Sequence, residues 1–421
     1  MFARTWRRSA GAWALVLAVA LAALPQRAAS ETACAIHSAQ ELVACALERH
    51  PDLAVAAQAE ARDRTLPDIA RQRPNPELDS RILGGKSADD SLVTTETTLF
   101  TVWELGGKRR SRVAAAQAQG RAARAETLAV RERVLLETVL ALHRLRQIRS
   151  ELAHIEETLA VFGKILRLYR GRPFLTPEQE VSLASFELAG EDYKLRRSRL
   201  TQDKFNLLGA LRIATRHPLE DVERFLPPAP RRWTAFDGPA AGGPPSNAAL
   251  EKAEAAREEA EAKARLARSE AWPDLRLGPT LETESLSHAT KTTGGLHFAL
   301  PLPVLNRNAG GQAYAQAEKI RAESALAAER GRQAVDRESW LSRYRAARKA
   351  LAQTPSPAAL GPRHAQVEAF FEKGLVPSTL VIEIHRQIND VAQTYHEQEL
   401  AALEALWRLY ILEGRAFAEK I

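Results

Sequence analysis

The sequence has few cysteines, few aromatic residues and almost no long apolar runs. Its 421 residues include two cysteines, and aromatic side chains make up 6% of the chain. Two cysteines near one end exclude a metal site built from cysteine clusters. Beyond the first 30 residues no apolar stretch approaches the length of a membrane-spanning helix. If the mature chain enters a membrane, it must therefore do so as β-strands.

The N-terminal 30 residues have the layout of a secretory signal peptide. Arg4, Arg7 and Arg8 precede the apolar run GAWALVLAVALAALP, and Ala28-Ala29-Ser30 supplies small residues before Glu31. An uncleaved membrane anchor is the alternative, but the run is shorter than the roughly 20 residues that a span needs. We expect residues 1–30 to be removed and the mature chain to be exported.

Positive charge in excess is confined largely to this segment. The first 30 residues carry four arginines and no acidic residue, so the remainder has 55 Lys and Arg against 52 Asp and Glu. Recognition of nucleic acid needs a clustered excess of positive charge. The sequence therefore predicts no nucleic-acid partner.

The two cysteines, Cys34 and Cys45, are eleven residues apart near the mature N-terminus. In an oxidising compartment such a pair is a possible disulfide that closes a small loop. Lipid modification of Cys34 is disfavoured, because Glu31-Thr32-Ala33 lacks the apolar residue that such a site requires.

The chain repeats itself. ALE at Ala46 recurs at Ala249, PNPEL from Pro74 matches WPDL from Trp272, and two pairs of glycines follow in the same order. Between the copies lies a segment rich in proline and glycine. The predicted domains are a first repeat at residues 31–225, a linker at 226–247 and a second repeat at 248–421.

Each repeat has the same predicted order of a helix, a β-hairpin and a long helical hairpin. A capping box of Ser38 and Glu41 opens a helix that Pro74 ends near Arg73. The remaining elements are expected at these ranges: β-hairpin 76–105 and helical hairpin 108–214 in the first repeat; helix 247–271, β-hairpin 274–304 and helical hairpin 308–414 in the second.

The long helices and the strands have opposite patterns. Apolar residues of the first long helix follow a 3,4 spacing typical of a coiled-coil seam, and those of its partner recur every seven: Leu152, Ile155, Leu159, Phe162, Leu166, Tyr169; Phe186, Tyr193, Leu200, Leu207. In the strands, Leu296, Phe298 and Leu300 alternate with His297 and Ala299. Alternation suits membrane strands, although a half-buried strand of a soluble protein looks the same. The predicted fold class is mainly α with a small β part.

Four strands cannot close a barrel, and unpaired strand edges are costly in lipid. Two copies would give eight strands and a barrel filled by side chains, whereas three would give twelve strands and a lumen. Insertion into a membrane therefore predicts a homotrimer.

WELGGKRRSRVAAAQA and LPLPVLNRNAGGQAYAQA, with the signal peptide and the repeat, resemble the TolC family of outer-membrane efflux proteins, nearest the CzcC branch of heavy-metal efflux. The resemblance covers essentially the whole mature chain. It implies a trimer with one twelve-stranded outer-membrane barrel continued by an α-helical tunnel into the periplasm. It also implies a passive channel for heavy-metal cations that works with a periplasmic adaptor protein and a proton-driven inner-membrane pump, without a cofactor.

Candidate functional residues lie at two kinds of position. Gly106, Gly107, Gly310 and Gly311 are predicted to form the strand-to-helix turns. The resemblance places contacts with the adaptor at the tips of the helical hairpins: Tyr169, Gly171, Phe371, Gly374, Leu375, Val376 and Ser378. The first tip departs from the family pattern through Arg172-Pro173. The three prolines of residues 354–363 should break the second long helix, with an effect that the sequence leaves open.

Enzyme motifs are lacking. His396-Glu397 is not followed by a second histidine at position 400, and GGKRRS lacks the glycine spacing of a phosphate loop. The histidine pairs 143/154 and 385/396 are interpreted as packed or solvated side chains. Two other functions stay open: a channel of the same architecture for polypeptide secretion or drug efflux, and a soluble periplasmic coiled-coil scaffold.

Overall fold

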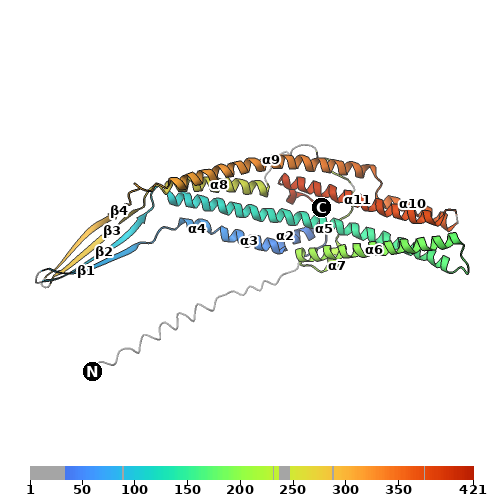
Figure 1. Ribbon diagram of the computed structural model, residues 1–421, viewed down its shortest axis with the longest axis horizontal. Helices are drawn as coiled ribbons and strands as arrows, with labels where there is room; N and C mark the ends of the chain where they lie inside the picture. The colour runs from blue at the N-terminus through green and yellow to red at the C-terminus, as the bar shows by residue number, and fades with distance from the viewer. Residues whose placement is uncertain (1–33, 88–89, 231, 237–246, 287–288, 374) are drawn as a thin grey trace, which may run out of the picture. The chain divides into compact units, whose positions relative to one another are not determined.

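The computed structural model describes residues 34–87, 90–230, 232–236, 247–286, 289–373 and 375–421. The chain divides into two units, residues 1–35 and 36–421, and the fold described below is that of the second. This unit is mainly helical and carries one four-stranded antiparallel sheet (Figure 1). None of the helices in the described part of the chain is both long enough and apolar enough to cross a membrane.

The helical start of the first repeat is divided into three pieces, α2 (Ala39–Arg49), α3 (Pro51–Asp63) and α4 (Leu66–Arg71). Ser38 caps α2, because its hydroxyl accepts from the Glu41 N–H at 3.3 Å. The predicted capping box is incomplete, since the Glu41 carboxylate accepts from the His37 N–H instead of the Ser38 N–H. A single helix reaching Arg73 was the wrong expectation. The ring of Pro51 restricts His50, which adopts ψ 130°, and so ends α2.

The two predicted β-hairpins form one sheet. Strands β1 (Glu77–Ser87) and β2 (Asp90–Trp103) pair with each other, β2 pairs with β3 (Leu275–Leu286), and β3 pairs with β4 (Ala289–Ala299). The second hairpin was expected to reach residue 304. Strand β4 ends at Ala299 because Pro301 and Pro303, which follow closely, have no N–H for a strand ladder.

The register gives this sheet one apolar and one charged face. Directly opposed residues of antiparallel strands share a face, as Leu78 and Leu99 do, and Leu277 and Phe298. The apolar face carries exposed Leu78, Ile82, Val93, Leu99, Trp103, Leu277, Leu281, Leu296 and Phe298. The opposite face carries Glu77, Asp79, Arg81, Glu96, Arg276, Glu282, Glu284, Lys291 and His297.

Helix α5 (Lys108–Arg170) occupies the predicted range and, at 1.5 Å per residue, is about 95 Å long. It turns back into α6 (Pro177–Thr215), and the short helix α7 (Leu219–Arg224) follows. The predicted seam is the core between α5 and α6: Phe162 packs edge-on against Phe186 and Tyr193, with ring centroids 5.3 and 5.6 Å apart. At the far end of the seam, Leu208 rather than Leu207 is buried.

The second repeat follows the same order with an interrupted long helix. Helix α8 (Ala248–Ser269) packs against α5 and α9 (Ala309–Gln353), and α10 (Pro357–Glu372) continues to the second tip. Helix α11 (Ser378–Leu412) returns along α10 and α9, and the short 3-10 helix Ala416–Ala418 lies near its end. In this unit the sheet lies at one end of the helices and both hairpin tips lie at the other (Figure 1).

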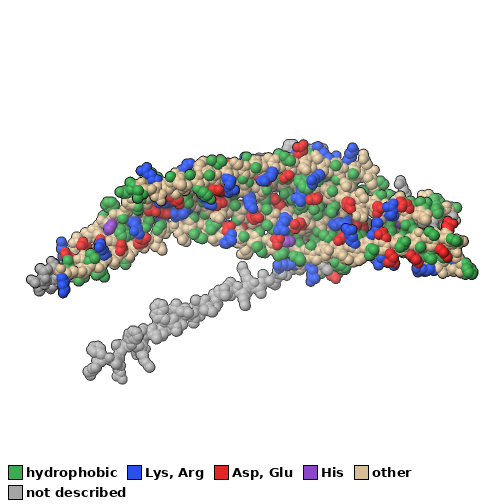
Figure 2. Space-filling view, in the orientation of Figure 1, with side chains coloured by type: hydrophobic (Ala, Val, Ile, Leu, Met, Phe, Trp, Pro, Cys, Tyr) green, Lys and Arg blue, Asp and Glu red, His purple; other side chains and the backbone are tan. Residues whose placement is uncertain are grey.

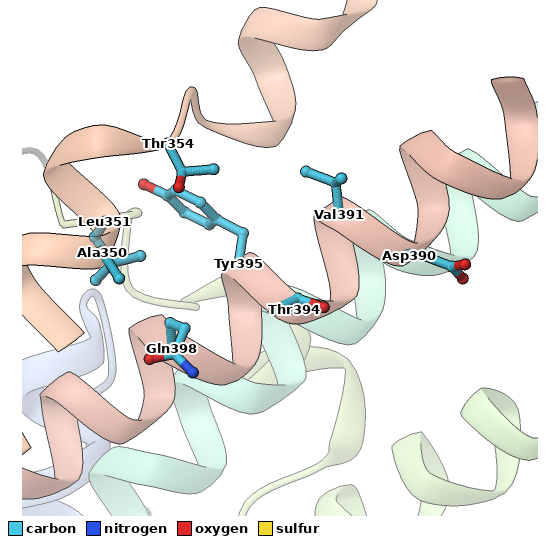
Figure 3. Close-up of a pocket in the computed structure, with 8 residues that line it drawn as sticks. All are labelled: Ala350, Leu351, Thr354, Asp390, Val391, Thr394, Tyr395 and Gln398. Carbon is cyan, nitrogen blue, oxygen red and sulfur yellow. The ribbon is translucent and has the colours of Figure 1, made fainter. Parts of the chain in front are cut away.

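The proline-rich segment breaks the long helix at residues 354–356, while Pro362 lies inside α10. Thr354 adopts an extended conformation there, with φ −110° and ψ 131°. The break opens a mostly apolar pocket of about 570 Å³ against α11, lined by Leu351 and Thr354 on one side and by Val391 and Tyr395 on the other (Figure 3).

The described part of the linker packs onto the second repeat. The hydroxyl of Tyr344 donates to the Thr234 carbonyl at 2.7 Å, and the buried ring of Phe236 lies 6.0 Å from that of Tyr410. Residues 237–246 lie outside the described residues. These contacts hold the described linker segment against α9 and α11.

Candidate functional site at the hairpin tips

The first tip is closed by hydrogen bonds at both helix ends. Gly171 is the C-cap of α5, and its N–H donates to the Arg167 carbonyl at 3.0 Å. Thr176 and Gln179 form a reciprocal capping box that starts α6. Gly171 has φ −80°, which any residue can adopt, so this helix end does not require glycine.

The second tip has a comparable closure. The Leu375 N–H donates to the Phe370 carbonyl at 2.9 Å, a bond that closes the C-terminal end of α10. Helix α11 then starts after Pro377, whose carbonyl accepts from the Leu380 N–H at 3.1 Å. Gly374 itself lies outside the described residues, so its left-handed conformation stays a prediction.

A pocket of about 500 Å³ lies between the two tips. Its lining from the first tip includes Tyr169, Arg172 and Thr176, and its lining from the second includes Phe371 and Val376. The guanidinium of Arg172 lies 5.7 Å from the centroid of the Tyr169 ring, a distance at which a cation interacts with an aromatic face. The first tip therefore contributes to this pocket through the residue in which it departs from the family pattern.

The apolar core beneath the pocket holds the two hairpins together. Tyr169 and Phe371 pack at the edge of one cluster with Phe162, Ile165 and Val381, which come from α5 and α11. Burial also raises the pKa of Tyr193 in this cluster to about 12. The position of one tip is thus coupled by packing to the position of the other.

The predicted tip residues fall into two groups. Tyr169, Phe371 and Val376 meet at the pocket, whereas Leu375 points outward with 68% of its surface exposed. Ser378 is the first residue of α11. The sequence prediction did not include Phe174, which is 90% exposed in the first loop. A large apolar residue next to Pro173 in a short loop was the signal that could have identified it.

The first strand-to-helix turn has the predicted glycine conformations. Gly106 has φ +73° and Gly107 has φ +79°, both in the left-handed region. A β-carbon on Gly106 would lie 2.8 Å from the Ser269 carbonyl oxygen and 2.9 Å from Cδ1 of Trp272. Gly106 therefore also provides the space in which the end of α8 packs against the turn.

The second turn corrects the prediction for Gly310 and Gly311. Both glycines lie in the first turn of α9, and the left-handed residue before them is Asn308, with φ +54°. The Asn308 amide donates to the Ala267 carbonyl at 2.9 Å and to the Glu270 carboxylate at 3.0 Å. Gly311 leaves room for this side chain, because a β-carbon there would overlap it. Asparagine tolerates this conformation and adds bonds that glycine lacks.

Buried polar contacts join α5 to α11 along the helical part. Arg144 and His396 both bond the Glu151 carboxylate, with Nη1 and Nδ1 each 2.8 Å from Oε1. His143 is buried without a hydrogen-bond partner for Nδ1 in the described structure, and burial lowers its pKa to about 4. Three of the four paired histidines are packed side chains: His143, His385 and His396.

The visible surface shows no patch of one charge. Acidic and basic side chains are interspersed along the helices on the face in view (Figure 2). The disulfide expected between Cys34 and Cys45 stays a prediction, which mass mapping of unreduced peptides would check.

Comparison with known proteins shows which proteins this architecture resembles. Residues 42–172 match the family model described as outer membrane efflux protein. The structure superposes on that of the Campylobacter jejuni CmeC outer membrane channel with a TM-score of 0.69, at 16% identity over 91% of this chain and 87% of that one. The chain has the outer-membrane channel fold.

Two further structures share this channel fold. The outer membrane protein VceC of Vibrio cholerae has a TM-score of 0.69 at 16% identity, covering 90% of this chain and 96% of its own. A membrane protein from Pseudomonas aeruginosa has a TM-score of 0.69 at 18% identity, covering 90% of each chain. No curated protein sequence matches the chain.

Proposed function

We propose that the protein is the outer-membrane channel of a tripartite efflux system. Three copies would join their four-stranded sheets into a twelve-stranded barrel, and their helices would continue the conduit into the periplasm. A periplasmic adaptor and a proton-driven inner-membrane pump would deliver the substrate, and the channel would conduct it passively. The proposal assigns the chain no catalytic centre.

The two-faced sheet carries this proposal. Its apolar face exposes 70% of Leu78, 79% of Leu296 and 71% of Phe298, while the opposite face is charged. Strands β1 and β4 are the edges of the sheet in the described structure. Lipid against the apolar face, water against the charged face and pairing of β1 with β4 of the next copy would satisfy all three features.

The tip pocket supports a role in adaptor docking. Figure 1 shows both hairpin tips at the end of the helices away from the sheet, and residues of both tips line the pocket. Exposed Phe174 and Leu375 flank it with apolar surface that nothing in the described chain covers. An adaptor that inserts its own apolar side chain between the tips would contact Tyr169, Phe371 and Val376 together.

A variant at the tip tests adaptor docking. Leu375→Glu should abolish resistance to a transported toxicant while leaving the amount of protein in the outer membrane unchanged, because Leu375 is exposed and supports little packing. Val55→Glu, at a 71% exposed position on α3, is the matched control and should keep resistance. Normal resistance in Leu375→Glu cells would contradict the docking role.

The Gly374→Val variant probes the same tip through its backbone. A β-branched residue at a left-handed position costs about 1 kcal/mol or more, so the loop that carries Leu375 and Val376 should change shape. Export should then be lost while assembly persists. Loss of the protein from the outer membrane would instead show that Gly374 has a structural role only.

For the substrate, we propose heavy-metal cations, on the sequence resemblance given above. Deletion of the gene should raise sensitivity to zinc more than sensitivity to an organic dye. The reverse result would favour drug efflux, and unchanged sensitivity to both with loss of a secreted polypeptide would favour protein secretion. Recovery of the protein in the soluble periplasmic fraction would favour the scaffold.

A further inference from the structure

A pocket of about 540 Å³ lies where the sheet meets the helices of the first repeat. Its lining comes from the segment before β1, with Arg73 and two prolines, and from the end of β2 and the start of α5, with Trp103 and Arg109. We refer to it as the junction pocket. Its residues are distant in sequence from both hairpin tips, and the proposed channel function assigns this pocket no role.

The ion pairs around the junction pocket leave two arginines without acidic partners. Lys108 Nζ lies 2.7 Å from the Asp274 carboxylate, and Arg112 bonds both oxygens of Glu104, which also lines the pocket. Arg73 and Arg109 make no ion pair with any residue that the structure describes. The pocket therefore has an excess of two positive charges.

The second repeat shows that these charges are not needed to form the junction. When PNPEL is matched to WPDL, Arg73 corresponds to Glu270, and when the left-handed N-cap residues Gly107 and Asn308 are matched, Arg109 corresponds to Gly310. The second junction also connects a strand to a long helix, through a longer segment, with an acidic and a neutral residue at these positions. A ligand explains the two arginines better than a requirement of the fold.

We propose that the junction pocket binds the phosphate group of an anionic phospholipid. The inference rests on the proposed placement of the sheet in a membrane. Arginine guanidinium groups match phosphate oxygens in geometry and charge. Phosphatidylglycerol suits the site better than phosphatidylethanolamine, because the ammonium group of the latter would add a third positive charge to the pocket.

The surroundings favour a lipid over a free phosphate ion. Trp103 lines the pocket, is 60% exposed and lies on the apolar face of the sheet, next to Leu275 of β3 in the register. Exposed tryptophan is typical of the boundary between headgroups and acyl chains. A headgroup in the pocket would leave its acyl chains free to lie along the apolar face that begins with Trp103 and Leu277.

The test compares lipid retention by the purified full-length protein. Native mass spectrometry of protein from mild detergent, after addition of phosphatidylglycerol, should show one lipid per chain retained at collision energies that remove the others. The double variant Arg73→Gln/Arg109→Gln should retain that lipid about thirtyfold less well, the factor expected for two basic side chains at an anionic lipid surface. The control double variant Arg110→Gln/Arg124→Gln removes the same charge from exposed positions of α5 outside the pocket and should behave as the wild type.

Three outcomes would overturn the proposal. These are equal retention by the pocket variant and the wild type, equal loss by both double variants, and arginine-dependent binding of inorganic phosphate with no preference for phosphatidylglycerol. Fractionation of the same cells reports separately on the channel proposal. Failure of lipid retention in a protein that still reaches the outer membrane would refute the lipid site and leave the channel function standing.

Discussion

Substitution of Gly106 by alanine should destabilise the protein more than the same change at its neighbour Gly107. Both glycines have positive φ, at +73° and +79°. A β-carbon on Gly107 would meet no atom within 4 Å, whereas one on Gly106 would lie 2.8 Å from a backbone oxygen and 2.9 Å from the Trp272 ring. The pair therefore separates the cost of backbone conformation from the cost of lost space.

The expected magnitudes follow from these two terms. A left-handed conformation costs alanine about 1–2 kcal/mol, so Gly107→Ala should lower the free energy of unfolding by that amount. Gly106→Ala adds an overpacking cost of about 1–3 kcal/mol, because the oxygen of Ser269 belongs to the backbone and cannot rotate away. Gly120→Ala, inside α5 with its nearest contact at 3.7 Å, should instead stabilise by about 0.5–1 kcal/mol.

The assay is equilibrium unfolding by urea in one detergent, with midpoints compared at equal slopes. Equal destabilisation by Gly106→Ala and Gly107→Ala would refute the steric argument. No destabilisation by either variant would refute the positive φ angles of the turn. A destabilising Gly120→Ala would show that the helix interior is packed more tightly than the structure has it.

The remaining predictions concern two buried titratable groups and the second turn. Burial lowers the pKa of His143 to about 4 in the folded protein, so as pH drops from about 6.5 the unfolded chain takes up a proton that the folded chain does not, and the free energy of unfolding falls. His143→Leu should remove about 2 kcal/mol of this loss at pH 5. An unchanged dependence of stability on pH in the variant would contradict the prediction. Burial raises the pKa of Glu132 to about 7, so stability falls as pH rises from about 4.5 to 7. Glu132→Gln should gain on the order of 1–2 kcal/mol at pH 8, after allowance for partial exposure, and nothing at pH 4.5 in urea unfolding. Asn308→Ala should cost about 2 kcal/mol by the same assay, and Asn308→Gly, which loses the bonds but relieves the φ angle, should cost about half as much.

Short-range patterns were enough to locate most elements. The 3,4 spacing between Leu152 and Tyr169 predicted a packed helix over the C-terminal part of α5, and Gly171 was expected to end it. Alternation in the strands predicted which residues share a face, since side chains alternate at every residue. Both results follow from periodicity, which the sequence contains directly.

The order of the four strands and the tip pocket required the tertiary structure. The pairing of β2 with β3 joins residues about 180 positions apart, and the meeting of Tyr169 with Val376 joins residues about 200 apart. No local pattern encodes a contact between such distant segments. The sequence comparison of the two repeats predicted equivalent positions, but not which of them would touch.

The two strand-to-helix turns show most clearly what the sequence determined and what the tertiary structure decided. The sequence by itself predicted that Gly106 and Gly107 form the turn between a strand and a helix, because glycine adopts positive φ angles without strain. It also suggested glycine for the second turn, where the folded chain uses Asn308 instead. The use of asparagine at position 308 depends on the Ala267 carbonyl and the Glu270 carboxylate, which α8 brings within hydrogen-bonding distance of its side chain. The residue type sets which backbone angles a position can adopt without strain, whereas the neighbouring residues in the fold decide whether its side chain makes stabilising hydrogen bonds there.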